Sequence, residues 1–143
     1  MIKLRDKISI LFILINICFL LYYSAQLLIF TDEFAIKNLG FFNHAVAGLC
    51  EILGIIFFCF SVGLLLSLHN GCKNFEPLFF TIFLIQIFIS FNFWRYIFTD
   101  SPGETNIEII LINALLFSSI SIIMLALIIR LFKIKRGEKN EQF

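Results

Sequence analysis

Four long apolar runs separated by short polar segments make up most of this chain. The runs cover residues of about 8–30, 45–68, 78–98 and 107–132. At 1.5 Å of rise per helical residue, each run is long enough to cross about 30 Å of hydrocarbon. The intervening segments are rich in turn formers, with Pro77 opening the third run and Pro102-Gly103 preceding the fourth. The pattern predicts an all-α protein: one domain over residues 1–143, folded as an integral membrane four-helix antiparallel bundle with a basic tail over residues 133–143.

The composition supports a membrane location for these helices. Hydrophobic residues make up 60% of the 143 positions and charged residues 15%, against about 45–50% and about 25% in soluble domains. The first run follows three basic residues, as in a secretory signal peptide, but it extends from Ile8 to Phe30 without an A-x-A cleavage site. Signal peptides have apolar regions of only about 7–15 residues. We therefore expect a retained first helix.

The basic residues predict the orientation in the membrane. With four spans, nine Lys and Arg residues fall on one side: Lys3, Arg5, Lys7, Lys73, Arg130, Lys133, Lys135, Arg136 and Lys139. The other side has only Lys37 and Arg95, against five acidic residues: Asp32, Glu33, Asp100, Glu104 and Glu108. Because Lys and Arg collect on the cytoplasmic side of short loops, we expect a multi-pass protein of the bacterial inner (plasma) membrane with both termini in the cytoplasm.

Glu51 is the one carboxylate well inside an apolar run. His44, Glu51 and Ser61 fall on one stripe of the second helix, with Ala47 and Gly54 beside them. Small and polar residues mediate helix association in lipid. This stripe is therefore the expected inward face of the helix, and Glu51 is expected to point into the bundle rather than to lipid.

Polar residues of the other helices reach the same level as Glu51. Glu51, Tyr23 and Asn113 each lie about 10 Å from the outer end of their helix, and Asn92 and Arg95 lie in the outer part of the third. We predict a polar pocket or buried network that opens to the outer side. The candidate binding residues are Glu51, Arg95, Tyr23, Asn113, His44, Asn92 and Gln26.

Three interpretations of Glu51 and Arg95 stay open. Arg95 can extend to the membrane interface beside Trp94 and Tyr96. The two charges can instead form an ion pair that locks the bundle. Alternatively, Glu51 is part of a site that binds a ligand, a proton or an ion. If Glu51 is buried and unpaired, it would be protonated, because burial disfavours its charged form.

No motif for catalysis, metal binding or a cofactor is visible. The cysteines are expected to be apolar packing residues: Cys18, Cys50, Cys59 and Cys72. His44 and His69 sit at opposite ends of one helix and cannot share a metal. The sequence has no phosphate-binding glycine loop, no nucleophile elbow and no HExxH motif. We expect a protein without metal or cofactor and without a nucleic-acid partner, and the lack of a catalytic motif favours a protein that is not an enzyme.

One motif resembles a known family. The second run opens with A-G-x-x-E-x-x-G at Ala47, Gly48, Glu51 and Gly54. In a four-span chain of this length, the motif resembles the DoxX-like membrane proteins, although the first run lacks glycine. The resemblance implies an outlying branch in which Glu51 is the functional position and the two glycines are its packing neighbours. Some members of the family are described as small subunits of quinone-reducing or redox-stress complexes, and many have no assigned activity.

The leading hypothesis is a DoxX-like, non-catalytic accessory or interaction protein with an outer-side polar pocket. Glu51 would then be structural, or would contact a partner or a lipophilic ligand. Its partners would be the lipid bilayer and another membrane protein or a second copy of the chain. A second hypothesis is a small proton-coupled transporter or channel-like protein, in which Glu51 takes up a proton and Arg95 tunes its pKa. A weaker one is a subunit of a quinone-linked oxidoreductase whose redox centre lies on another chain.

Overall fold

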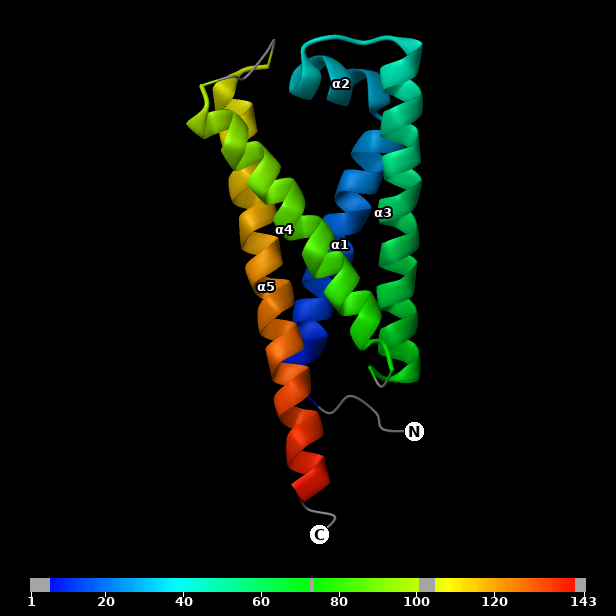
Figure 1. Cartoon of the computed structure of the whole chain (residues 1–143). Coiled ribbons are helices and arrows are strands. Elements are labelled where there is room, and N and C mark those ends of the chain that lie inside the picture. Colours follow the sequence, from blue (N-terminus) through cyan, green and yellow to red (C-terminus); the bar gives the residue numbers. More distant parts are fainter. Residues whose placement is uncertain (1–5, 73, 101–104, 141–143) are drawn as a thin grey trace.

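The computed structural model is a bundle of five helices and describes residues 6–72, 74–100 and 105–140, with side chains as far as residue 135 (Figure 1). The helices are α1 (Lys7–Leu28), α2 (Thr31–Leu39), α3 (His44–Asn70), α4 (Glu76–Phe98) and α5 (Ile107–Asn140). Four of them, all except α2, are long and apolar enough to cross a membrane. The predicted all-α architecture with four membrane-length helices is confirmed.

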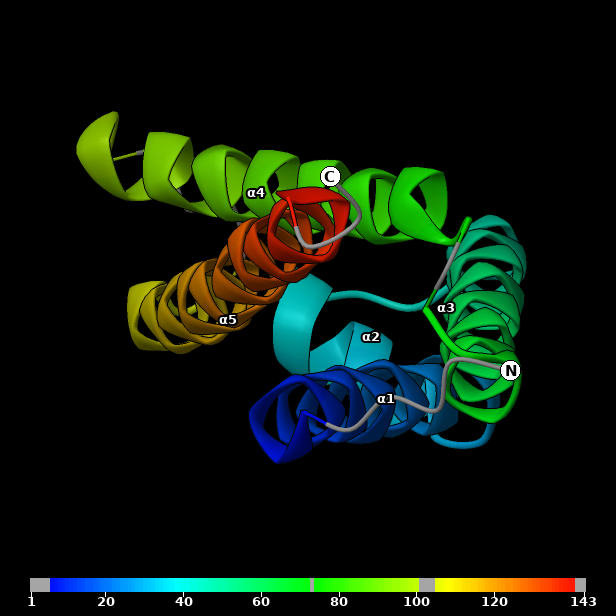
Figure 2. The same cartoon turned by 90° about the horizontal axis from the view of Figure 1, so that it is seen from below.

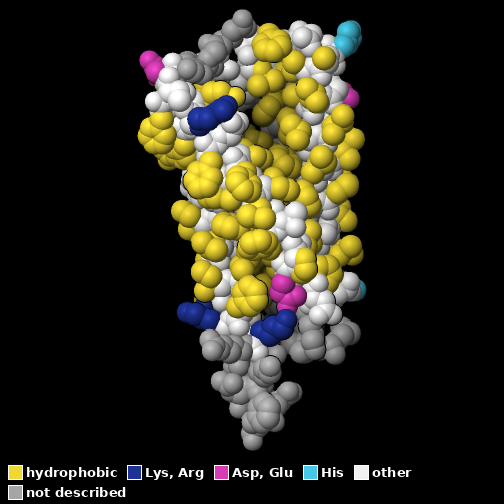
Figure 3. Space-filling view, viewed as in Figure 1, with side chains coloured by type: hydrophobic (Ala, Val, Ile, Leu, Met, Phe, Trp, Pro, Cys, Tyr) yellow, Lys and Arg dark blue, Asp and Glu magenta, His cyan; other side chains and the backbone are white. Residues whose placement is uncertain are grey.

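The four long helices run alternately up and down and form two closely packed pairs. α1 packs along α3, α4 packs along α5, and α1 also contacts α5. α4 begins beside the end of α3 and diverges from it toward the end of the bundle that carries α2 (Figure 1). The start of α1 and the end of α5 lie at the opposite end (Figure 1). The surface between the two ends is largely apolar, with Lys and Arg side chains near the ends (Figure 3), as a multi-pass membrane protein requires.

Local signals explain where the helices begin. The Asp6 carboxylate caps α1 by accepting from the Ile8 amide, and the Asn43 side chain caps α3 by accepting from the Val46 amide at 2.9 Å. Pro77 lies in the first turn of α4, where the sequence places it. Lys3, Arg5, Lys73 and the Pro102-Gly103 break are outside the described residues.

Helix α2 is the element that the hydrophobic pattern does not predict. It occupies nine residues of what the sequence indicates is a loop. Asp32 and Glu33 lie in its first turn and Lys37 in its last turn, which is the charge order that a helix dipole favours. Gly40 then ends the helix at φ 80°, in the left-handed region that glycine adopts readily. α2 packs against α1 and α3, and when the bundle is viewed along its axis it lies between α1, α3 and α5 (Figure 2).

The fifth helix differs from its prediction in length. The sequence indicates that the last span ends near residue 132 and is followed by a basic tail. In the structure α5 continues as helix to Asn140, because Lys, Arg and Glu are good helix formers and no proline interrupts the segment.

Hydrogen bonds between polar side chains join the helices inside the bundle. The Gln86 amide of α4 donates to Asn16 Oδ1 of α1 at 3.0 Å. Ser90 of α4 and Ser118 of α5 lie 2.6 Å apart, and the Trp94 indole donates to the same Ser118 oxygen at 3.0 Å. Such contacts replace the hydrophobic driving force that is missing between helices in lipid.

Candidate functional site

A pocket of about 220 Å³ lies between α1, α2 and α5 at the end of the bundle that carries α2. The residues that line it are Tyr22, Tyr23, Gln26, Glu33, Phe34, Lys37, Asn38, Ile109, Ile112, Asn113 and Leu116. Three of the residues predicted from the sequence, Tyr23, Gln26 and Asn113, are among them. A polar pocket at this level of the bundle is therefore present, but its walls come from a different set of helices than expected, and none of its lining residues belongs to α3.

A hydrogen-bond network fixes one wall of the pocket. The Tyr23 hydroxyl donates to Asn113 Oδ1 at 2.7 Å, and Asn113 Nδ2 donates to Asn38 Oδ1 at 2.9 Å. Asn38 in turn donates to the Phe34 carbonyl at 2.9 Å. Tyr23 and Asn113 are buried, at 5% and 9% exposure. The network therefore ties α1, α5 and α2 together, and its members satisfy one another.

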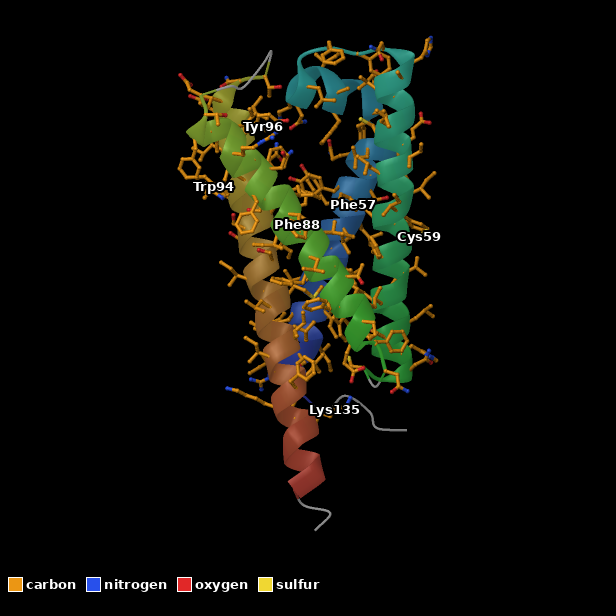
Figure 4. The ribbon with its side chains drawn as sticks, in the orientation of Figure 1. Phe57, Cys59, Phe88, Trp94, Tyr96 and Lys135 are labelled. Atoms are coloured by element: carbon orange, nitrogen blue, oxygen red, sulfur yellow. The ribbon has the colours of Figure 1, made fainter. Side chains whose placement is uncertain are left out.

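Aromatic packing holds Tyr23 in place. Its ring lies 4.8 Å from that of Phe19 and 4.9 Å from that of Phe117, measured between centroids, with Phe57 of α3 farther away at 6.5 Å. Phe57 points into the bundle, whereas Cys59 lies on the other side of α3 (Figure 4). Because neighbouring rings enclose the Tyr23 ring, its hydroxyl is directed at Asn113 by packing as well as by the hydrogen bond.

The charged side chains of the pocket both come from α2. Glu33 and Lys37 are four residues apart, so they project from the same face of this short helix, and both are exposed. In the described part of the chain, ion pairs join Asp6 to Arg130 and Glu76 to Lys135. Glu33 and Lys37 belong to neither pair. The rim of the pocket thus offers one negative and one positive group.

Glu51 lies outside the pocket, and its expected inward orientation is wrong. The buried residues of α3 are Cys50, Gly54, Phe57, Ser61, Leu64 and Ser67. This stripe shares Gly54 and Ser61 with the predicted one but is rotated around the helix, and Glu51 is exposed. The closest approach of α3 to α1 is at Gly54, where an added Cβ would lie 2.7 Å from Leu28 Cγ. The buried stripe passes through Cys50 and Gly54, and Glu51 lies beside it on the exposed side.

The other predicted residues lie apart from the pocket. His44, Asn92 and Arg95 are exposed, at the same end of the bundle as the pocket but not on its walls. The Arg95 guanidinium stacks over the Tyr96 ring at 4.8 Å, near the end of α4. Among the described residues no ion pair joins Arg95 to Glu51, so of the three open interpretations, the ion pair that would lock the bundle is not formed.

Sequence reasoning missed the contribution of α2 to the pocket. Phe34, Lys37 and Asn38 line it, yet they lie in a segment interpreted as a loop. The available signal was the acidic first turn, the basic last turn and Gly40 within TDEFAIKNLG. The hydrophobic windows that detect spans are too long to detect a nine-residue helix.

Other groups with reactive chemistry do not gather into a site. All four cysteines are free; Cys50 and Cys72 are buried, whereas Cys18 and Cys59 are exposed, so packing within the bundle explains only the first two. Burial raises the pKa of the Cys72 thiol to about 11, which keeps it protonated and unreactive at neutral pH. No group of three or more His, Cys, Asp or Glu side chains suited to a metal occurs within the described ranges.

An ion pair between Asp6 and Arg130 joins the start of α1 to α5. Arg130 of α5 forms two hydrogen bonds to the Asp6 carboxylate, one of them from Nη2 to Oδ1 at 2.9 Å. Ser9 also donates to Asp6, at 2.5 Å. These hydrogen bonds, that of Arg130 above all, hold the pKa of Asp6 well below its usual range. This pair is far from the pocket and joins the start of α1 to α5.

Comparison with protein-family models, with curated proteins and with solved structures finds no match to this chain. The resemblance to DoxX-like proteins therefore rests on the motif around Glu51. Within that motif Gly54 packs against α1, whereas an added Cβ at Gly48 would meet no atom within 4 Å.

Proposed function

We propose that this chain is a non-catalytic accessory protein of the bacterial inner membrane, with both termini in the cytoplasm, which binds another membrane protein through the α3 surface around Glu51. The orientation is supported by the positions of the basic side chains. Lys7, Arg130, Lys133 and Lys135 lie at the end opposite α2, whereas Asp32 and Glu33 lie on α2 itself.

The exposed carboxylate of Glu51 is the observation that carries this proposal. It lies seven residues from the start of a 27-residue membrane-length helix. Its neighbours on the same face, Ile55 and Phe58, are 53% and 49% exposed. An ionisable side chain facing lipid costs about 2.5–3.5 kcal/mol at the bilayer centre and less toward the interface, on which side Glu51 lies. A second protein that covers this face and hydrogen-bonds the carboxylate removes that cost.

The chemistry of Glu51 indicates what kind of partner fits. A second copy packed through the same face about a two-fold axis would bring two Glu51 carboxylates together, which is unfavourable in a medium of low dielectric constant. A different membrane helix with a basic or amide side chain at that depth is complementary. The accessory role suggested by the DoxX-like resemblance is of this kind. The transport and redox hypotheses remain predictions, and no feature of the pocket or of α3 favours them specifically.

Site-specific photo-crosslinking in native membranes tests the proposal. A benzoylphenylalanine placed at Ile55 is expected to give one adduct with a different membrane protein. The same group at Ile122, a still more exposed site on α5 (66% against 53%), is expected not to give it. Glu51→Leu should reduce the adduct about tenfold or more, because the partner's polar group is left unpaired. An adduct with the mass of two copies of this chain, or one insensitive to Glu51→Leu, would overturn the proposal.

Two controls make this result specific. The Glu51→Leu variant must still fold. Since no described residue pairs with Glu51, we expect the midpoint temperature of its thermal unfolding in detergent to be unchanged or slightly higher than that of the wild type. Once the partner is identified, Glu51→Lys should restore the adduct when the complementary basic residue of the partner is changed to Glu. If that exchange fails to restore it, the carboxylate is not the recognition element.

A further inference from the structure

The pocket between α1, α2 and α5 lies beside the last two turns of α1, at the end of the bundle that faces the outer membrane surface in the proposed orientation. Its α1 wall begins at Tyr22 and ends at Gln26, which lie about 9 Å and about 3 Å before the end of that helix at Leu28. The charged helix α2 closes it on the water side. We propose that this pocket binds the head group of a membrane phospholipid that carries both a phosphate and a primary ammonium, as phosphoethanolamine does.

The polar groups of the pocket fall into two sets. Tyr23, Asn113 and Asn38 are hydrogen-bonded to one another and form the framework. By contrast, the Tyr22 hydroxyl and the Gln26 amide have no hydrogen-bond partner in the part of the chain that the structure describes, and Glu33 and Lys37 form no ion pair there. The pocket groups that stay free to bind a ligand are therefore those of Tyr22, Gln26, Glu33 and Lys37.

The charges of this second set match a zwitterion. Glu33 and Lys37 stand one helical turn apart on the pocket side of α2. The Lys37 ammonium complements a phosphate, and the Glu33 carboxylate complements an ammonium. A primary ammonium donates hydrogen bonds to the Glu33 carboxylate and the Gln26 amide oxygen, whereas the trimethylated nitrogen of choline has no hydrogen to donate. The site therefore favours ethanolamine over choline and over uncharged head groups.

The size and the apolar edge of the pocket indicate a lipid rather than a soluble molecule. A volume of about 220 Å³ is below the range of about 300–1,000 Å³ that encloses drug-sized ligands, so a head group fits and its acyl chains must lie outside. Ile112 and Leu116 line the pocket and are also 57% and 43% exposed. They continue the pocket onto the apolar surface of α5, where the chains can lie. Binding here does not depend on the Glu51 partner.

Native mass spectrometry of the purified full-length chain with lipids of identical acyl chains tests this assignment. Phosphatidylethanolamine is expected to bind about tenfold more tightly than phosphatidylcholine or phosphatidylglycerol, since hydrogen bonds to a charged group are worth about 1.5–3 kcal/mol. Glu33→Gln should remove the preference for ethanolamine, and Lys37→Gln should weaken all three lipids. Equal binding of the choline lipid would overturn the proposal.

Matched variants distinguish lipid binding in the pocket from lipid binding elsewhere on α2 and α5. Asp32→Asn removes the same charge from the same turn but does not line the pocket, so lipid binding should not change. Ile112→Trp fills the pocket and should abolish binding, whereas Leu111→Trp, beside it and outside the lining, should not. The Trp pair keeps the test decisive if a charge variant fails to fold. Ethanolamine-lipid binding that survives both Glu33→Gln and Ile112→Trp would show that the site lies elsewhere.

Free phosphoethanolamine distinguishes the two sources of this head group. It should compete with the lipid only at concentrations at least about a hundredfold higher, because it lacks the apolar contacts with α5. Competition at the same concentration as the lipid would mean a site for a soluble zwitterion and would overturn the lipid assignment.

Discussion

At the scale of single residues, Tyr23 and Glu51 lie at similar depths in neighbouring helices. Tyr23 is buried and forms a 2.7 Å hydrogen bond with Asn113, whereas Glu51 is exposed on α3. Helix spacing predicts the common depth of these residues but not that Glu51 points away from the bundle. Depth follows from counting residues at 1.5 Å each. Rotation about the helix axis depends on contacts with neighbouring helices, which a single stripe of residues does not determine.

The Tyr23 hydroxyl offers a direct test of the network. Tyr23→Phe leaves the buried Asn113 Oδ1 without its donor, and we expect it to lower the free energy of unfolding by about 0.5–1.5 kcal/mol. Tyr22→Phe is the matched control, because this neighbouring hydroxyl has no hydrogen bond within the described residues. Thermal unfolding of both variants in lipid-free detergent would measure the difference. Equal stability of the two would show that the Tyr23–Asn113 bond contributes nothing.

At the scale of elements, the long helices follow from hydrophobic pattern and the short one does not. Each span is apolar over many turns, and the surrounding lipid requires its backbone to be hydrogen-bonded internally, so a helix is the only outcome. α2 depends instead on its charge order, on Gly40 and on packing against α1 and α3. Three of the seven polar residues that line the candidate pocket, Glu33, Lys37 and Asn38, come from this element. The pocket could therefore be located only in part from the sequence.

The contact between α1 and α3 predicts opposite effects for two glycines of the same helix. A Cβ at Gly54 would lie 2.7 Å from Leu28 Cγ and 3.1 Å from Leu27 Cβ, and Ser24 donates to the Gly54 carbonyl at 3.0 Å. Gly54→Ala should therefore destabilise the protein by about 1–3 kcal/mol through overpacking. Gly48→Ala meets no atom within 4 Å and should be neutral or stabilising by up to about 1 kcal/mol, because alanine is the better helix former.

Unfolding of the two variants in the same detergent measures this difference. A loss of stability for Gly48→Ala equal to that for Gly54→Ala would contradict the packing described here. It would also mean that the Gly48 face of α3 is covered, which is the arrangement expected if both glycines of A-G-x-x-E-x-x-G are packing positions.

At the scale of the whole molecule, the two ends of the bundle differ in their chemistry. The end with α2 holds the pocket and its unpaired charges. The other end is closed by ion pairs, Asp6 with Arg130 and Glu76 with Lys135. Neither pair was predicted from the sequence, because both join residues far apart in the chain whose approach depends on how α1, α4 and α5 cross. The charges of one end thus stabilise the fold, while those of the other stay available for binding.

The Asp6–Arg130 pair makes stability depend on pH in a defined direction. The folded protein lowers the pKa of Asp6, so folding favours the ionised carboxylate. Its contribution is complete above the pKa of the unfolded state, about 3.9, and is lost as the pH falls below that value toward the lower folded pKa.

Asp6→Asn keeps a good N-cap residue for α1 but removes the charge. Its stability should therefore be lower than that of the wild type at pH 6, and the difference should begin to narrow as the pH falls from about 4 toward 3. Unfolding in detergent across pH 3–6 measures both curves. Asp6→Ala also removes the N-cap, so it should be less stable than Asp6→Asn by a further ~0.5–2 kcal/mol. Parallel curves for the wild type and Asp6→Asn would show that Asp6 is not ionised preferentially in the folded state.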